Sequence, residues 1–258
     1  MLASFRRIAD QEAVQLASMI NTQGYACLEN YLDEAQLAQA RAFVEEHAIK
    51  QSGRYFAFHG KDAVKGTVLD MLGSAPEFNE LLHAIHLHGS GNTAHSPTVY
   101  QVLRCVQGNM GSKESNCFHY DATLLTVLIP IEIPDEESGN GDLLVFPNLR
   151  RVRRLVGLNV LEKCLLQNRL SRSLITKGIK HSLLKPLKLQ LIPGNAYFFW
   201  GYRSLHANEP CHPDLRRATA LFHYGDPHAG SLSTRLILML NQRRARRRTN
   251  MPNPVTMN

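Results

Sequence analysis

The chain has 258 residues, of which 44% are hydrophobic and 20% are charged. This composition excludes disordered, collagen-like and disulfide-framework proteins, and the length suits one or two globular domains. The five cysteines are odd in number and form no CxxC pair, which indicates reduced thiols in a cytoplasmic protein. No apolar run approaches the roughly 20 residues of a membrane span, and the N-terminus lacks the apolar segment of a signal peptide.

The net charge of +7 is concentrated in two places. The segment from Arg150 to Lys188 holds eleven basic residues and one acid, Glu162, and the tail from Arg243 to Arg248 holds five arginines. The rest of the chain is therefore acidic. This pattern favours an anionic partner near the basic segments. The alternatives are a solvated helix face for the first segment and a frayed terminus for the second.

Residues 1–96 are predicted to be mainly helical. The first helix runs from Asp10 to about Thr22, and a short extended piece, Gly24–Leu28, follows it. The second helix begins near Asp33, where Gln36 completes a capping box. A third helix, from about Ala75 to His88, has apolar residues at helical spacing.

The sequence from residue 97 to 240 is typical of short strands separated by glycine and proline turns, which favours a barrel or sandwich. An amphipathic and basic insertion, about residues 150–188, interrupts these strands and is predicted to be helical. The tail, residues 241–258, is expected to be flexible. The predicted strands are Pro97–Val106, Phe118–Ile133, Asp142–Phe146, Leu187–Ile192, Ala196–Trp200, Arg216–Tyr224 and Arg235–Leu240.

Three residues form a candidate metal site. His119 and Asp121 lie two positions apart at the start of a predicted strand, where such residues face the same side. His206, which follows a later strand, would supply a third ligand. Two histidines and one carboxylate on one face of a metal are the ligand set of non-heme Fe(II) oxygenases. The alternative is a buried histidine with a structural carboxylate partner.

A candidate anion site lies further along the chain. Arg217 and Thr219 are two positions apart on a predicted strand and would share a face. A guanidinium and a hydroxyl held together can bind a terminal carboxylate. Strand alternation alone does not decide whether Arg216 or Arg217 points inward.

These motifs resemble the Fe(II)/2-oxoglutarate-dependent oxygenases, and within them the phytanoyl-CoA dioxygenase-like branch. The spacing of the arginine from His206 and from His223 matches that family when the arginine is Arg217, which selects it over Arg216. The resemblance covers most of the chain, and its motifs come in the family's order: Gly24–Leu32, His119-x-Asp121, Gly139–Pro147, Pro193-Gly194-Asn195, His206 and Arg217-x-Thr219.

The resemblance implies a β-rich α+β fold, with a double-stranded β-helix of the jelly-roll or cupin-like kind as its core. The N-terminal helices and the basic helical insertion would flank this core within a single dioxygenase domain, residues 1–258. It also implies Fe(II) held by His119, Asp121 and His206, with O2 as the oxidant. The 2-oxoglutarate cosubstrate would be anchored by Arg217 and Thr219. Because Asp121 retains its carboxylate, hydroxylation is expected rather than halogenation.

The substrate is less well defined by the sequence. Tyr100, Arg104 and Tyr202 are predicted to contact it. The expected reaction hydroxylates a small-molecule or carrier-bound substrate and releases succinate and CO2, and the basic segments favour an anionic substrate. The long basic insertion departs from the family pattern, so a coenzyme-A ester is not carried over as the substrate.

Two other functions compete with this prediction. The same fold can bind a metal or ligand without catalysis. The basic insertion and the arginine-rich tail can also indicate nucleic-acid binding. Nucleic acid is the less favoured partner, because the basic stretches lack interleaved aromatic residues and any recognisable reader motif.

Overall fold

Two antiparallel sheets and a set of helices form the part of the chain described by a computed structural model, namely residues 5–111, 115–134, 139–152, 162, 166 and 168–228. The helices are α1 (Asp10–Gln23), α2 (Glu34–Lys50), the 3-10 helix η1 (Lys61–Val64), α3 (Val68–Ser74), α4 (Pro76–Ser90), α5 (Gly108–Gly111) and α7 (Arg169–Lys180). The strands are β1 (Ala26–Leu28), β2 (Phe56–His59), β3 (Tyr100–Val106), β4 (Leu125–Glu132), β5 (Leu143–Phe146), β6 (Leu187–Leu189), β7 (Ala196–Phe199), β8 (Leu205–Asn208) and β9 (Arg217–Tyr224).

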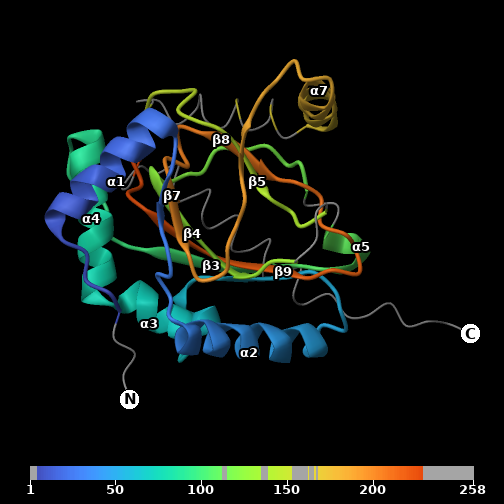
Figure 1. Ribbon diagram of the computed structural model, residues 1–258, viewed down its shortest axis with the longest axis horizontal. Helices are drawn as coiled ribbons and strands as arrows, with labels where there is room; N and C mark the ends of the chain where they lie inside the picture. The colour runs from blue at the N-terminus through green and yellow to red at the C-terminus, as the bar shows by residue number, and fades with distance from the viewer. Residues whose placement is uncertain are drawn as a thin grey trace, which may run out of the picture.

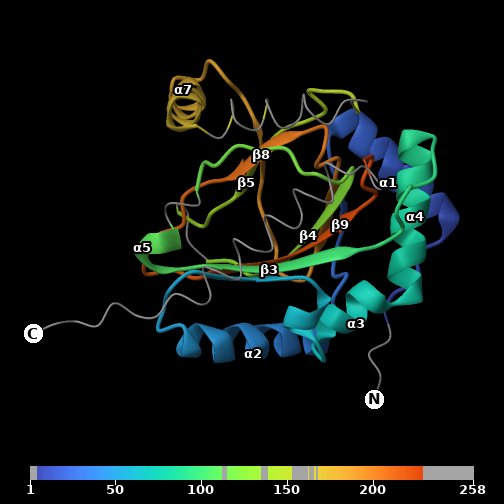
Figure 2. The ribbon, with the colours of Figure 1, turned by 180° about the vertical axis from the view of Figure 1, so that it is seen from behind.

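The larger sheet has the strand order β1-β7-β4-β9-β3-β2, and the smaller sheet has the order β6-β5-β8. An isolated bridge between His119 and His206 extends the smaller sheet beyond β8. Helices α1 and α4 lie side by side at one end of the molecule, while α2 and α3 lie against the large sheet (Figure 1). The view from behind shows α7 on the opposite side, next to β5 and β8 (Figure 2).

The main hydrophobic core lies between the large sheet and the N-terminal helices. Alternation along β9 explains this, because Ala218, Ala220 and Phe222 face the helices and are nearly inaccessible to solvent. The ring of Phe222 packs edge-to-face on Phe78 of α4, with 5.1 Å between ring centroids. The other face of β9, which carries Arg217, therefore points between the two sheets.

The small sheet is also apolar on both faces. Its inner residues, among them Leu143 and Val145, pack with Leu128 and Phe199 of the large sheet. Its outer face is covered in part by α7 of the basic insertion. This outer cluster contains Phe118, Leu144, Leu205 and Ala207, against which Leu166, Ile175 and Ile179 pack.

The predicted N-terminal helices are found within one or two residues of their expected bounds. Helix α2 begins after Asp33, whose carboxylate accepts a hydrogen bond from the backbone N–H of Gln36, while the Gln36 side chain accepts one from the Asp33 N–H. The predicted capping box is therefore confirmed. Strand β2 and helix α3 were not predicted, since both are too short to show a clear periodicity.

The strand predicted over Phe118–Ile133 is shorter in the structure, where β4 begins only at Leu125. Residues 118–121 instead cross to the small sheet, because His119 exchanges backbone hydrogen bonds with His206. Pro130 lies in an interior strand, next to a register shift between β4 and β9, so a proline in this long extended segment is accommodated by an irregularity of the strand pairing and not by a sheet edge.

Part of the basic insertion is described, and α7 confirms that this part is helical. Most of residues 153–167, the strand predicted over Arg235–Leu240 and the tail predicted over residues 241–258 lie outside the described residues. Among the described helices, none has the length and apolar character needed to cross a membrane.

Candidate metal centre

His119, Asp121 and His206 meet where the small sheet approaches the large one. His119 and His206 are cross-bridged backbone partners, and the Asp121 N–H donates to the carbonyl of Gly201. One ligand atom from each of the three side chains lies within 4.8 Å of the others. The Nε2 atoms of both histidines are 3.6 Å from oxygens of the Asp121 carboxylate.

Backbone carbonyls hold the two imidazoles in one orientation. Nδ1 of His119 is 2.8 Å from the carbonyl oxygen of Cys117, and Nδ1 of His206 is 2.9 Å from that of Ser204. A carbonyl only accepts hydrogen bonds, so each Nδ1 carries a proton and each Nε2 faces Asp121. A histidine whose other ring N–H donates to a backbone carbonyl in this way is typical of metal binding.

Asp121 is seated against two other residues. The hydroxyl of Thr126, in β4, donates to Oδ2 of Asp121 at 2.5 Å, and it also lies 3.3 Å from Nδ1 of His223. Gly201 leaves room for this contact, because a Cβ there would lie 2.2 Å from Asp121 Oδ2 and 2.3 Å from the Thr126 hydroxyl oxygen. The carboxylate is therefore fixed before any ligand arrives.

The ionisable groups of the site shift one another's pKa values. Burial alone would raise the pKa of Asp121, but the facing imidazoles of His206 and His223 outweigh it, so the pKa is lowered. Burial, followed by the neighbouring His206, lowers the pKa of His119 to about 4. Burial also opposes the charged form of His206, but Asp121 outweighs burial and raises the pKa of His206. Asp121 is thus ionised and His119 neutral near neutral pH.

Arg217 is buried inside the molecule, with only 1% of its surface exposed. Its Nη2 donates to the side-chain oxygen of Asn208 at 3.1 Å, whereas Nε and Nη1 have no hydrogen-bond partner among the described residues. Burial, followed by the nearby charge of Arg104, lowers its pKa to about 10, so Arg217 stays charged at neutral pH. Gly141 accommodates the side chain, since a Cβ there would lie 2.6 Å from Arg217 Cδ.

A buried cation with two unused donors is a site for an anion. Asn208, which binds Arg217, lies two residues after His206 on the same face of β8, about 7 Å along the strand. The register of β8 therefore places the partner of Arg217 and the candidate ligand His206 on the same face of the strand.

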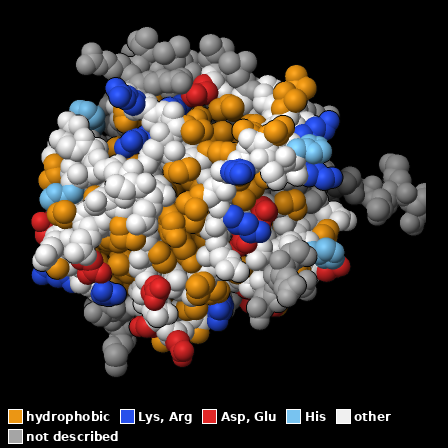
Figure 3. Space-filling model, turned by 45° about the horizontal axis from the view of Figure 1, so that its top comes forward, with side chains coloured by type: hydrophobic (Ala, Val, Ile, Leu, Met, Phe, Trp, Pro, Cys, Tyr) orange, Lys and Arg blue, Asp and Glu red, His pale blue; other side chains and the backbone are white. Residues whose placement is uncertain are grey.

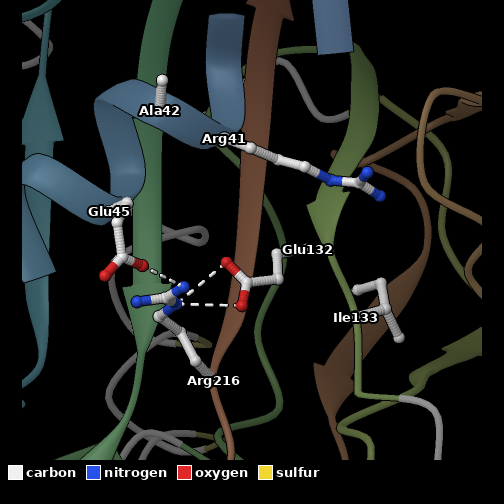
Figure 4. A pocket seen from close by; sticks show the side chains of 6 residues that line it. All are labelled: Arg41, Ala42, Glu45, Glu132, Ile133 and Arg216. Carbon is white, nitrogen blue, oxygen red and sulfur yellow. Dashed lines mark hydrogen bonds and ion pairs between the residues drawn. The ribbon is translucent and has the colours of Figure 1, made fainter. Parts of the chain in front are cut away.

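Arg216 points to the opposite side of the sheet. Figure 4 shows its guanidinium between Glu45 of α2 and Glu132 of β4, with N–O distances of 2.5 Å and 2.8 Å. These residues, with Arg41 and Ile133, line a surface pocket of about 440 Å³ that contains none of the candidate metal ligands. Backbone alternation therefore places Arg217, and not Arg216, on the inner face.

The remaining predicted site residues lie at different distances from this centre. Thr219 shares the inner face of β9 with Arg217 and is paired across the sheet with Arg104, whose charge reaches both metal-ligand histidines. Tyr100 is paired with His223 and is 41% exposed. Tyr202 is buried under the guanidinium of Arg150, and its hydroxyl lies 3.2 Å from Nε2 of His228. The assignment of Tyr100, Arg104 and Tyr202 to the substrate stays a prediction.

Two contributors to the site, Thr126 and Asn208, were not identified from the sequence. His223, which the sequence singled out only by its spacing from Arg217, lies near Asp121 and Thr126 in the structure. Thr126 and Asn208 carry no such signal, since their side-chain contacts depend on the crossing of the chain between the two sheets.

The donor set fits a divalent metal of the iron type. Two imidazole nitrogens and one ionised carboxylate lie within 4.8 Å of one another, and such mixed N/O ligand sets bind Fe(II) in sites that keep open positions. The residues therefore fit both groups implied by the resemblance, the metal at the triad and the anion at Arg217.

Comparisons with known proteins identify the fold. No protein-family model matches the chain, and no curated protein matches it. Solved structures do match. A prolyl hydroxylase from Trichoplax adhaerens, in complex with a hypoxia inducible factor oxygen degradation domain peptide fragment, has a TM-score of 0.57 at 15% identity, over 84% of this chain and 90% of that one.

Two further structures give similar agreement. A Pseudomonas putida prolyl-4-hydroxylase has a TM-score of 0.53 at 10% identity, over 87% of this chain and 99% of that one. The non-heme alpha-ketoglutarate-dependent epimerase SnoN from nogalamycin biosynthesis has a TM-score of 0.55 at 14% identity, covering 84% and 82%. SnoN has also been solved with Fe3+ and alpha-ketoglutarate. At these identities the likeness establishes the fold alone.

Proposed function

We propose that this protein is a non-heme Fe(II)- and 2-oxoglutarate-dependent oxygenase that hydroxylates a small-molecule or carrier-bound substrate. The observation that carries the proposal is the convergence of His119, Asp121 and His206 within 4.8 Å. Buried Arg217, with two unused donors, adds the anion site that a dicarboxylate cosubstrate requires. The shared fold with prolyl hydroxylases and SnoN supports the proposal.

In this proposal each residue has a separate task. The Nε2 atoms of His119 and His206 and the Asp121 carboxylate would hold the iron, which when bound supplies the activation of O2. Arg217, with Thr219 beside it, would bind the far carboxylate of 2-oxoglutarate and so orient the cosubstrate. The apolar cluster between the sheets, including Leu128 and Phe199, excludes water from the space behind the ligands.

Finer assignments belong to the same proposal. The facing sheets would form a double-stranded β-helix, and the order of the motifs supports the phytanoyl-CoA dioxygenase-like branch. The carboxylate of Asp121 favours hydroxylation over halogenation, although related folds also perform epimerisation. The four described cysteines, Cys27, Cys105, Cys117 and Cys211, are free thiols, which supports a cytoplasmic location.

The test is release of succinate by the iron-loaded protein. Wild type supplied with Fe(II), ascorbate, O2 and 2-oxoglutarate should release succinate and CO2. A screen of amino acids, carrier-bound acyl groups and small natural-product cores should identify a substrate that raises the rate of succinate release. Asp121→Ala should abolish turnover. Arg217→Ala should weaken 2-oxoglutarate binding roughly tenfold to hundredfold, because charge-assisted hydrogen bonds are lost.

Two results would contradict the proposal. Iron and 2-oxoglutarate binding without succinate under any condition would favour a non-catalytic binding protein. Full turnover by Asp121→Ala would exclude the triad as the iron site.

A further inference from the structure

Helix α7 presents apolar side chains on two opposite faces. Ile175 and Ile179 pack inward against the outer face of the small sheet. On the other side, Leu170 is 70% exposed and Leu174 is 60% exposed. The inner residues already satisfy the packing of α7, so the outer leucines are not needed for the described core.

The turn after α7 adds two more exposed leucines and holds them in fixed positions. Ser182 has a left-handed φ of 58°, its N–H donates to the Ile179 carbonyl, and the Leu183 N–H donates to that of Gly178. This is the Schellman pattern, in which the residue at the Leu183 position usually packs back on the helix. Here Leu183 is 81% exposed and Leu184 is 39% exposed.

The charged side chains that neighbour these leucines in the sequence are all basic. Between Asn168 and Lys188 the sequence contains six basic residues and no acid. Lys177, Lys180 and Lys185 are exposed beside the leucines. Figure 3 looks toward this side of the molecule, and at its upper right hydrophobic, basic and histidine side chains project next to one another.

We propose that this α7 surface, made of Leu170, Leu174, Leu183 and Leu184 with Lys177, Lys180 and Lys185, binds the surface of an anionic lipid bilayer. The lysines complement anionic headgroups, while the leucines enter the interfacial region. Leu170, Leu174 and Leu183 project from α7 and its C-terminal turn, while Leu184 lies back against Gly178. Three separate protrusions suit a deformable lipid surface better than the groove of an acidic protein. The inference is independent of the proposed oxygenase activity.

The experiment is co-sedimentation of the full chain with vesicles. Wild type should bind vesicles of phosphatidylcholine and phosphatidylglycerol, and should bind phosphatidylcholine alone about tenfold less or weaker. Added salt should reduce binding, because it screens the lysines. The Leu170→Asp/Leu174→Asp and Lys177→Glu/Lys180→Glu variants should each lose about tenfold or more in binding.

Control variants distinguish binding through the α7 surface from non-specific binding and from misfolding. Ile49→Asp, on α2, replaces a residue that is also 70% exposed and should leave vesicle binding unchanged. Thermal melting should be unchanged in every variant, since all the altered side chains are exposed. Absence of wild-type binding to anionic vesicles, or equal binding by the leucine variant, would overturn the inference. Binding to polyglutamate in place of vesicles would also overturn it, in favour of an acidic protein partner.

Discussion

Asp121 is the residue on which the candidate metal centre depends most. It faces both ligand histidines through its two oxygens, and it receives a hydrogen bond from Thr126 on its outer side. A metal ligand restrained in this way loses little freedom on binding, so its hydrogen-bond partner contributes to metal affinity without touching the metal.

Replacing Thr126 tests this restraint. Thr126→Val preserves the shape of a fully buried side chain but removes the hydroxyl that donates to Asp121. We expect the dissociation constant for Co(II), measured by titration calorimetry, to rise about tenfold or more. Thr126→Ser should retain wild-type affinity. Equal affinity in all three proteins would show that the hydrogen bond does not position Asp121.

The pKa shifts predict how metal binding depends on pH. The pKa of His206 is raised, because Asp121 stabilises its charged form, and a proton on this imidazole must leave before Nε2 can bind a metal. His119, with a pKa of about 4, is already neutral near neutral pH, and the lowered pKa of Asp121 keeps it ionised. Metal binding should therefore release the His206 proton and weaken as the pH falls.

Calorimetry in two buffers of different ionisation enthalpy would count that proton. Metal affinity that does not weaken as the pH falls, or metal binding that releases no proton, would contradict the raised pKa of His206.

The candidate ligands were predictable, but the packing around them was not. His119 and Asp121 share a short motif, and His206 and Arg217 follow it in the order that the sequence resemblance predicts. The alternation of side chains along β9 predicts that Arg217 points inward only when it is known which face of the strand packs against the helices. The contacts of Thr126 and Asn208 depend on where the two sheets meet, and the local sequence does not indicate this position.

At the scale of elements, α2 depends strongly on its first turn. The helix covers the large sheet through Leu37, Ala40 and Val44, and its N-terminus is held by the capping box of Asp33 and Gln36. Such boxes satisfy two backbone donors that the helix cannot satisfy itself.

Asp33→Ala should lower the free energy of unfolding by about 1 kcal/mol, measured by urea denaturation. Asp33→Asn should lower the free energy of unfolding much less, because the amide oxygen can still accept a hydrogen bond from the Gln36 N–H. Gln39→Ala, at an exposed position of the same helix, serves as a neutral control. A loss in Asp33→Ala no greater than that in the control would mean that the cap does not stabilise α2.

The N-terminal helices were predicted well because amphipathic spacing and capping residues are local signals. The segment 118–133 shows the limit of such signals. Most of its residues are strand-forming, yet the chain leaves one sheet for the other before Leu125, and the pairing partners His206 and Gly201 decide where it leaves.

At the scale of the whole molecule, the candidate metal site joins parts of the chain that are far apart in sequence. His206 belongs to the small sheet, and Asp121 lies against Thr126 of the large sheet. A metal held by both residues cross-links the two sheets in the folded state, and the unfolded chain has no such site. Metal binding should therefore stabilise the fold as well as prepare it for chemistry.

The expected size of this effect follows from mass action. A metal at about 100 times its dissociation constant adds about 2.7 kcal/mol of stability, which for a chain of this size raises Tm by roughly 5–10 °C. Differential scanning calorimetry with Mn(II) or Co(II) should show this increase, and a chelator should reverse it. Asp121→Ala should melt at a temperature that no longer responds to metal. If wild type and Asp121→Ala respond equally, the stabilising metal binds elsewhere, and the two sheets are joined by packing alone.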